Sequence, residues 1–77
     1  MRINVYIVTY NNEIIEEVEN KLSSLGKLIK KSRSAVVPQL YFYRLETSDK
    51  GSIEKLLGEY EEKELIAWFK VEVTLSE

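Results

Sequence analysis

The sequence predicts an α+β domain whose elements follow in the order β-α-β-β-α-β. Apolar and polar residues alternate near the start of the chain, from Ile3 to Thr9, and again near its end, from Leu65 to Leu75. Two segments between these ends carry apolar residues at helical spacing. A lysine-rich stretch and an aromatic stretch lie between the two helical segments, which completes the order.

The first strand is expected from Ile3 to Thr9, because its odd positions are β-branched and share one face. Asn11 and Asn12 are good helix-capping residues, and acidic side chains follow them in what would be the first helical turn. A helix from about Asn12 to Ser24 is therefore predicted. Its apolar stripe comprises Ile14, Ile15, Val18, Leu22 and Leu25.

Gly26 follows this helix at the position of a left-handed C-terminal cap, and a second strand is predicted from Lys27 to Arg33. Pro38 suits the start of a third strand, which is expected from Gln39 to Glu46. Both sides of this third strand carry aromatic residues, so its register stays open. One side holds Tyr41, Tyr43 and Leu45, and the other holds Leu40, Phe42, Arg44 and Glu46.

A shorter apolar stripe, interrupted by Gly58, predicts the second helix. Its apolar members are Ile53, Leu56, Leu57 and Tyr60. An acidic turn from Glu59 to Glu64 then leads into the alternating final strand, Leu65 to Leu75.

Two right-handed crossovers in this order place the first and third strands at the centre of an antiparallel sheet. The prediction is a ferredoxin-like βαββαβ domain covering residues 1–77, with strand order 4-1-3-2 and both helices on one face. The other face is expected to be aromatic. It would hold Tyr6, Val8, Tyr10, Ile66 and Trp68.

Composition limits the chemistry that the chain can perform. Its 77 residues include no Cys and no His, which removes thiol catalysis, cysteine zinc sites, and the commonest general base and metal ligand. No catalytic residue, metal ligand or cofactor is predicted, and the chain is expected not to be an enzyme. A domain this small buries a marginal core, so we expect a homodimer. The start of the chain does not resemble a signal peptide, and no long apolar run is present, so a cytoplasmic protein is expected.

Positive charge is concentrated in one stretch, although the chain as a whole has a formal net charge of −2. Six basic residues and no acidic residue lie between Lys21 and Arg44. This segment can contact an anionic partner such as nucleic acid, or it can simply protect an edge strand from aggregation. The predicted contact residues are Lys27, Lys30, Lys31, Arg33 and Arg44.

Aromatic residues provide the second candidate site. If Tyr41 and Tyr43 face outward beside Tyr6, they would resemble the sheet platform on which RNA-recognition motifs stack unpaired bases. The alternative is that the aromatic face packs against another subunit. Tyr6, Tyr41, Tyr43 and Trp68 are therefore predicted to stack or to form an interface. The acidic residues Glu61, Glu62 and Glu64 are interpreted as a solvated turn.

Two stretches resemble the small CRISPR-associated nuclease-like proteins that accompany the CRISPR integrase, and their SinR-like relatives. These stretches are Val5 to Asn11 and Leu25 to Ser32. The resemblance implies a ferredoxin-like homodimer that associates with duplex DNA and has a metal-dependent nuclease activity. In that family an Asp ends the first strand and binds the metal, whereas this chain has Asn11.

The leading hypothesis is a non-catalytic homodimeric interaction module that contacts an anionic partner through segment 21–44. One alternative is the metal-dependent nuclease that the resemblance implies. Another is a small-molecule effector module, because ACT domains and the ligand domains of Lrp-type regulators share the βαββαβ order. Their characteristic glycines after the first strand are absent here.

Overall fold

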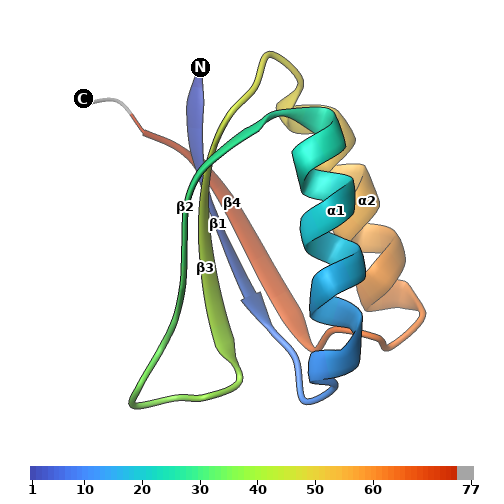
Figure 1. Ribbon diagram of the computed structural model, residues 1–77. Coiled ribbons are helices and arrows are strands. Elements are labelled where there is room, and N and C mark those ends of the chain that lie inside the picture. The colour runs from blue at the N-terminus through green and yellow to red at the C-terminus, as the bar shows by residue number, and fades with distance from the viewer. Residues whose placement is uncertain (75–77) are drawn as a thin grey trace.

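The computed structural model describes residues 1–74 and contains four strands, two α-helices and one short 3₁₀ helix (Figure 1). In chain order these are β1 (Arg2–Val8), η1 (Asn12–Ile14), α1 (Ile15–Leu25), β2 (Lys27–Arg33), β3 (Leu40–Glu46), α2 (Lys50–Glu62) and β4 (Trp68–Val73). The end of the predicted final strand, at Leu75, lies outside the described residues.

The strands form one open sheet in the order β2-β3-β1-β4, and each neighbouring pair is antiparallel. Both helices cover the same face of this sheet, as Figure 1 shows. The predicted α+β class, the four-stranded antiparallel sheet and the two helices are confirmed. No helix within residues 1–74 has the length and apolar character needed to cross a membrane.

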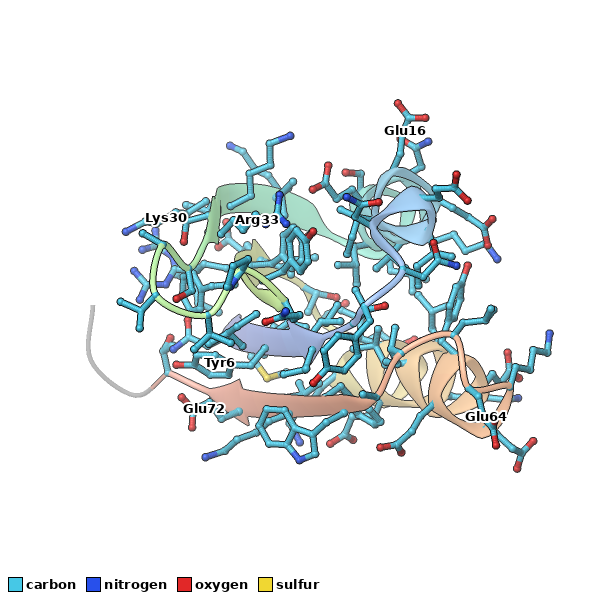
Figure 2. The ribbon with its side chains drawn as sticks, turned by 90° about the horizontal axis from the view of Figure 1, so that it is seen from below. Tyr6, Glu16, Lys30, Arg33, Glu64 and Glu72 are labelled. Carbon is cyan, nitrogen blue, oxygen red and sulfur yellow. The ribbon has the colours of Figure 1, made fainter. Side chains whose placement is uncertain are left out.

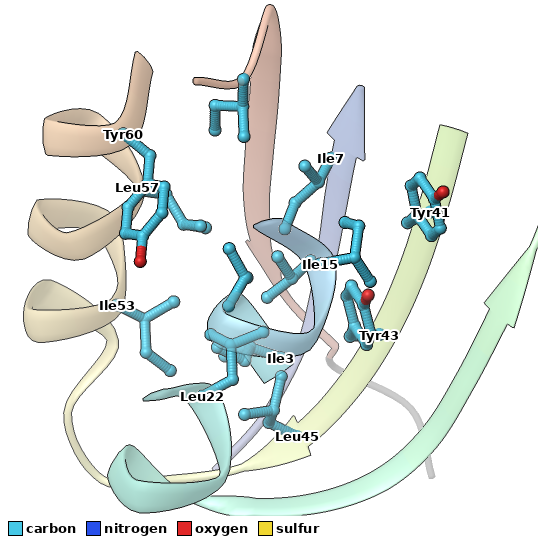
Figure 3. Close-up of a cluster of buried hydrophobic side chains, with 13 residues drawn as sticks. Ile3, Ile7, Ile15, Leu22, Tyr41, Tyr43, Leu45, Ile53, Leu57 and Tyr60 are labelled. Carbon is cyan, nitrogen blue, oxygen red and sulfur yellow. The ribbon is translucent and has the colours of Figure 1, made fainter. Parts of the chain in front are cut away.

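The hydrophobic core lies between the sheet and the helices (Figure 3). Ile3, Val5 and Ile7 of β1 are completely buried because alternate residues of a strand point to the same face. They meet the apolar stripes of the two helices. The buried helical members of the core are Ile15, Val18 and Leu22 from α1, with Ile53, Leu57 and Tyr60 from α2.

The β1–β3 register settles the orientation of the third strand. Val5 pairs with Tyr43 and Ile7 pairs with Tyr41, so these two tyrosines share the helix-covered face with β1's buried residues. Tyr41 is 7% exposed and Tyr43 is 1% exposed. The alternate residues Leu40, Phe42 and Arg44 therefore lie on the face that no helix covers, which we call the open face.

The expected left-handed cap at Gly26 is wrong. Gly26 has φ −174°, which is extended backbone and not a left-handed cap. Only glycine fits at this position without a steric clash, because a Cβ atom there would lie 2.7 Å from the carbonyl oxygen of Glu46. Gly58, which interrupts the apolar stripe in the sequence, lies within α2, and the helix continues to Glu62; a Cβ atom at Gly58 would meet nothing within 4 Å.

The final strand begins at Trp68 and not at Leu65, because the chain turns after α2. The backbone N–H groups of Leu65 and Ile66 both donate to the carbonyl oxygen of Tyr60, which ties this segment to the last turn of α2. Ile66 consequently enters the core at 2% exposure and does not lie on the open face as predicted. Tyr10 lies beyond the end of β1 and is 78% exposed.

Candidate functional site

Charge is divided between the two layers of the molecule. Within residues 1–74, the strands carry seven basic and two acidic residues, whereas the helices, η1 included, carry three basic and eight acidic residues. In Figure 2 the labelled Lys30 lies on the sheet side, and Glu16 and Glu64 lie with the helices. The sheet layer is therefore positive and the helical layer negative, although the whole chain is slightly acidic. A polyanion would be attracted to the sheet.

An aromatic pair occupies the centre of the open face. Tyr6 of β1 and Phe42 of β3 are direct cross-strand partners, with ring centroids 5.2 Å apart and ring planes inclined by 54°. Both side chains are half-buried, so each keeps part of its surface accessible. Trp68 extends the apolar surface to the β4 edge and is 46% exposed.

Basic side chains lie beside this aromatic centre and toward one end of the open face. The guanidinium carbon of Arg44 lies 5.9 Å from the Phe42 ring centroid, and Arg44 Nε donates to Asn4 Oδ1 at 3.0 Å. These two contacts fix the guanidinium above the ring. Lys30 is the cross-strand partner of Arg44 and shares its face. The basic residues on the open face are Arg2, Lys27, Lys30, Arg44 and Lys70, against the acids Glu46 and Glu72.

The five predicted contact residues do not form one group. A β-bulge between Leu28 and Lys30 shifts the register of β2, which places Lys27 and Lys30 on one face and the other two basic residues of that strand on the opposite face. Lys31 and Arg33 pair with Tyr43 and Tyr41, on the helix-covered face. Lys27, Lys30 and Arg44 come together on the open face, and Lys31 and Arg33 do not join them.

Lys31 and Arg33 have partners on their own side of the sheet. Lys31 Nζ lies 3.3 Å from Glu19 Oε1 of α1. Arg33 Nε donates to the Pro38 carbonyl at 2.7 Å, and its guanidinium carbon lies 5.2 Å from the Tyr41 ring centroid. Both residues line a small hollow of about 230 Å³ beside α1. Alternation and the bulge together therefore divide the predicted basic segment between two surfaces.

The expectation that Tyr41 and Tyr43 stack with Tyr6 is wrong. Both rings are buried under the helices, and the Tyr43 hydroxyl donates to Glu19 Oε2 at 2.9 Å. Burial, and next the hydrogen bond to the Glu19 carboxylate, raise the pKa of Tyr43 well above its ordinary value. Phe42 takes the place beside Tyr6. The sequence could not identify Phe42, because both sides of β3 carry aromatic residues.

The end of β1 forms a separate hollow of about 450 Å³, which is lined in part by Thr9, Asn11, Glu61 and Glu64. Asn11 Oδ1 accepts the backbone N–H of Glu13 at 3.1 Å, so this amide caps η1. Within residues 1–74, no three acidic side chains lie close enough to hold a metal ion together. The nuclease activity implied by the resemblance stays a prediction, as does the effector-module alternative.

Comparison of the chain with models of protein families, with curated proteins and with solved structures gives no match.

Proposed function

We propose that this chain is a ferredoxin-like, non-catalytic binding module that takes single-stranded nucleic acid on its open sheet face. The observation that carries the proposal is the Tyr6–Phe42 pair, which no helix covers and beside which Arg44 is held in place. Aromatic rings on central strands stack on unpaired bases, and Arg adds a cation–π contribution.

The charge of the face supports a polyanionic ligand. Five basic residues share the open face with the aromatic centre, and only two acidic residues lie on this face within the described part of the chain. Each phosphate that a basic side chain contacts releases a counterion, which favours binding at low salt. A single strand satisfies both features, since it presents unpaired bases to the rings and phosphates to the lysines. The bases of a duplex are stacked inside the helix and do not reach a flat face.

The test is a salt titration of binding to fluorescently labelled oligonucleotides. Fluorescence anisotropy would be measured with single-stranded RNA, single-stranded DNA and duplex DNA of ~12 nucleotides, a length within the range that one small domain covers. The proposal predicts tighter binding of either single strand than of the duplex. It also predicts that affinity falls as the salt concentration rises. Absence of single-strand binding at low salt would rule the proposal out.

Homodimerisation through the same face is the second candidate. Val8, Leu40 and Trp68 form an apolar end of the open face, and apolar sheet faces commonly pack between subunits. Like charges oppose such pairing, because two copies of this net positive face would meet. Sedimentation analysis at micromolar concentration separates the candidates. A dimer that dissociates when oligonucleotide binds would mean that the two partners compete for one face.

A further inference from the structure

The open face, which is proposed to contact phosphates, carries an acidic residue, Glu72, beside its aromatic pair. Glu72 of β4 borders a shallow hollow of about 260 Å³ beside the aromatic pair. The other residues lining this hollow are Tyr6, Leu40, Trp68 and Lys70. A carboxylate here repels phosphate, so it weakens the attraction of the face for a nucleic-acid backbone. The second acid of the face, Glu46, differs because it lies at the sheet end directly between its cross-strand partners Arg2 and Lys27.

The Glu72 carboxylate is held in position by its neighbours. Tyr6 and Glu72 are labelled in Figure 2. The Tyr6 hydroxyl donates to Glu72 Oε1 at 3.2 Å, and Lys70 Nζ lies 3.6 Å from Glu72 Oε2. The register explains this arrangement, because Lys70 pairs with Tyr6 and Glu72 pairs with Asn4, the next residue of β1 on the same face. The apolar walls of the hollow come from Leu40 and Trp68. The hollow therefore combines apolar side chains with two charged hydrogen-bonding groups.

We propose that this hollow holds one base of the bound strand and selects guanine. This inference rests on the proposed function. The hollow is smaller than the roughly 300–1,000 Å³ of pockets for drug-sized ligands, which suits a single base. In the proposed arrangement the base packs against Trp68 and Tyr6, and its pairing edge faces Glu72 and Lys70.

Hydrogen-bonding chemistry distinguishes guanine from the other bases. Its pairing edge presents two neighbouring donors, the ring N1–H and the amino group, beside the acceptor O6. A carboxylate accepts from both donors at once, in the same fork geometry that it uses with Arg, and a lysine ammonium donates to O6. Adenine and cytosine present one donor beside a bare ring nitrogen, and thymine presents one donor between two carbonyl oxygens. Each of these bases sets an acceptor against a carboxylate oxygen.

The test uses oligothymidylate of ~12 nucleotides with a single central position changed to guanine, adenine or cytosine. One guanine avoids the self-association of guanine runs. A bidentate base contact implies about 5- to 150-fold tighter binding of the guanine oligonucleotide than of plain oligothymidylate. Glu72→Gln should bring this ratio close to one, because an amide offers one acceptor and one donor. Glu46→Gln is the control, since it removes the same charge from the same face and should leave the ratio unchanged.

The possible failures are distinct. If no oligonucleotide binds at low salt, the proposed function is wrong and this inference fails with it. If all four oligonucleotides bind equally well, the face binds nucleic acid and only the base selection is wrong. A guanine preference that survives in Glu72→Gln would also overturn the assignment of Glu72 as the selecting group.

Discussion

Tyr6 and Phe42 face each other across the two central strands, with ring centroids 5.2 Å apart, on the sheet face that the helices leave open. Their neighbours along the same strands point the other way and are buried, including Val5 and Tyr43. The strand pattern thus separates aromatic residues that build the core from aromatic residues that remain accessible. The proposed binding surface depends on this separation.

Replacing either ring of the pair should weaken binding of single-stranded oligonucleotides. Stacking contributes about 1–3 kcal/mol per base, so Tyr6→Leu and Phe42→Leu should each raise the dissociation constant about 5- to 150-fold. Anisotropy measures this change directly. Tyr10→Leu is the control, because Tyr10 is an exposed aromatic residue beyond the end of β1. An equal loss in Tyr10→Leu would show that binding does not depend on the open face.

Gly26→Ala should destabilise the fold, because the new methyl group would lie 2.7 Å from the Glu46 carbonyl oxygen and 2.9 Å from Thr47 Cβ. Relieving this overlap requires backbone movement, and we expect a loss of about 1–3 kcal/mol in the free energy of unfolding. Urea denaturation measures the loss. Gly58→Ala is the matched control, since that position is open and helical, and it should gain about 0.5–1 kcal/mol. Equal effects of the two substitutions would argue against the close approach at Gly26.

Asp49 should contribute to the acid sensitivity of the protein. Its carboxylate caps α2 by accepting hydrogen bonds from the hydroxyl and the backbone N–H of Ser52, and these bonds lower the pKa of Asp49 below its ordinary value of 3.8. The capping stabilisation is therefore complete above pH 3.8 and is lost as the pH falls through the lower, folded-state value. Asp49→Asn keeps a capping oxygen at every pH. Urea midpoints of the two proteins would be measured at pH 7 and below pH 3. Between these pH values Asp49→Asn should lose less stability than the unsubstituted chain. Identical losses of stability would contradict the assignment.

Tyr43 should contribute to the alkaline sensitivity. Its pKa is raised by burial and by the hydrogen bond to Glu19, so ionisation favours the unfolded chain. The stabilisation is complete below the ordinary pKa of 10.0 and is lost as the pH rises above it. Tyr43→Phe removes the ionisable group and one hydrogen bond to a carboxylate, so it should cost about 1–3 kcal/mol at pH 7. It should also lose less stability than the unsubstituted chain between pH 9 and pH 11, as judged by urea midpoints. A parallel decline of the two proteins would contradict this role.

Much of the fold could be predicted because its signals are local. The alternation of Ile3, Val5 and Ile7 defined the buried side of the first strand, and the stripe that includes Val18 and Leu22 defined the first helix. The role of Gly26 could not be found in this way. It depends on the approach of Glu46, which is distant in sequence, so a local capping rule gave the wrong conformation.

The site was harder to predict than the fold, because it depends on which face each strand residue occupies. A shift of one residue exchanges the two faces of a strand. The aromatic residues on both sides of β3 therefore left Tyr43 and Phe42 equally eligible for the open face. The bulge after Leu28 has no clear signal in the sequence, and it moves Lys31 away from Lys27. The pairing of β3 with β1, and of β2 with β3, determines which face each of these residues occupies.

The central claim is that the open face binds nucleic acid, and Lys30→Ala compared with Lys31→Ala tests it most directly. The two lysines are adjacent in sequence and carry equal charge, but Lys30 shares the open face with Arg44 and Lys31 faces α1. In salt titrations with single-stranded oligonucleotide, Lys30→Ala should weaken binding and reduce the slope of log affinity against log salt by about 1. Lys31→Ala should leave both values close to those of the unsubstituted chain. Equal losses in the two variants would show that the basic segment acts as a whole. A loss confined to Lys31→Ala would place the contact on the helix-covered side. Either result would contradict binding by the open face.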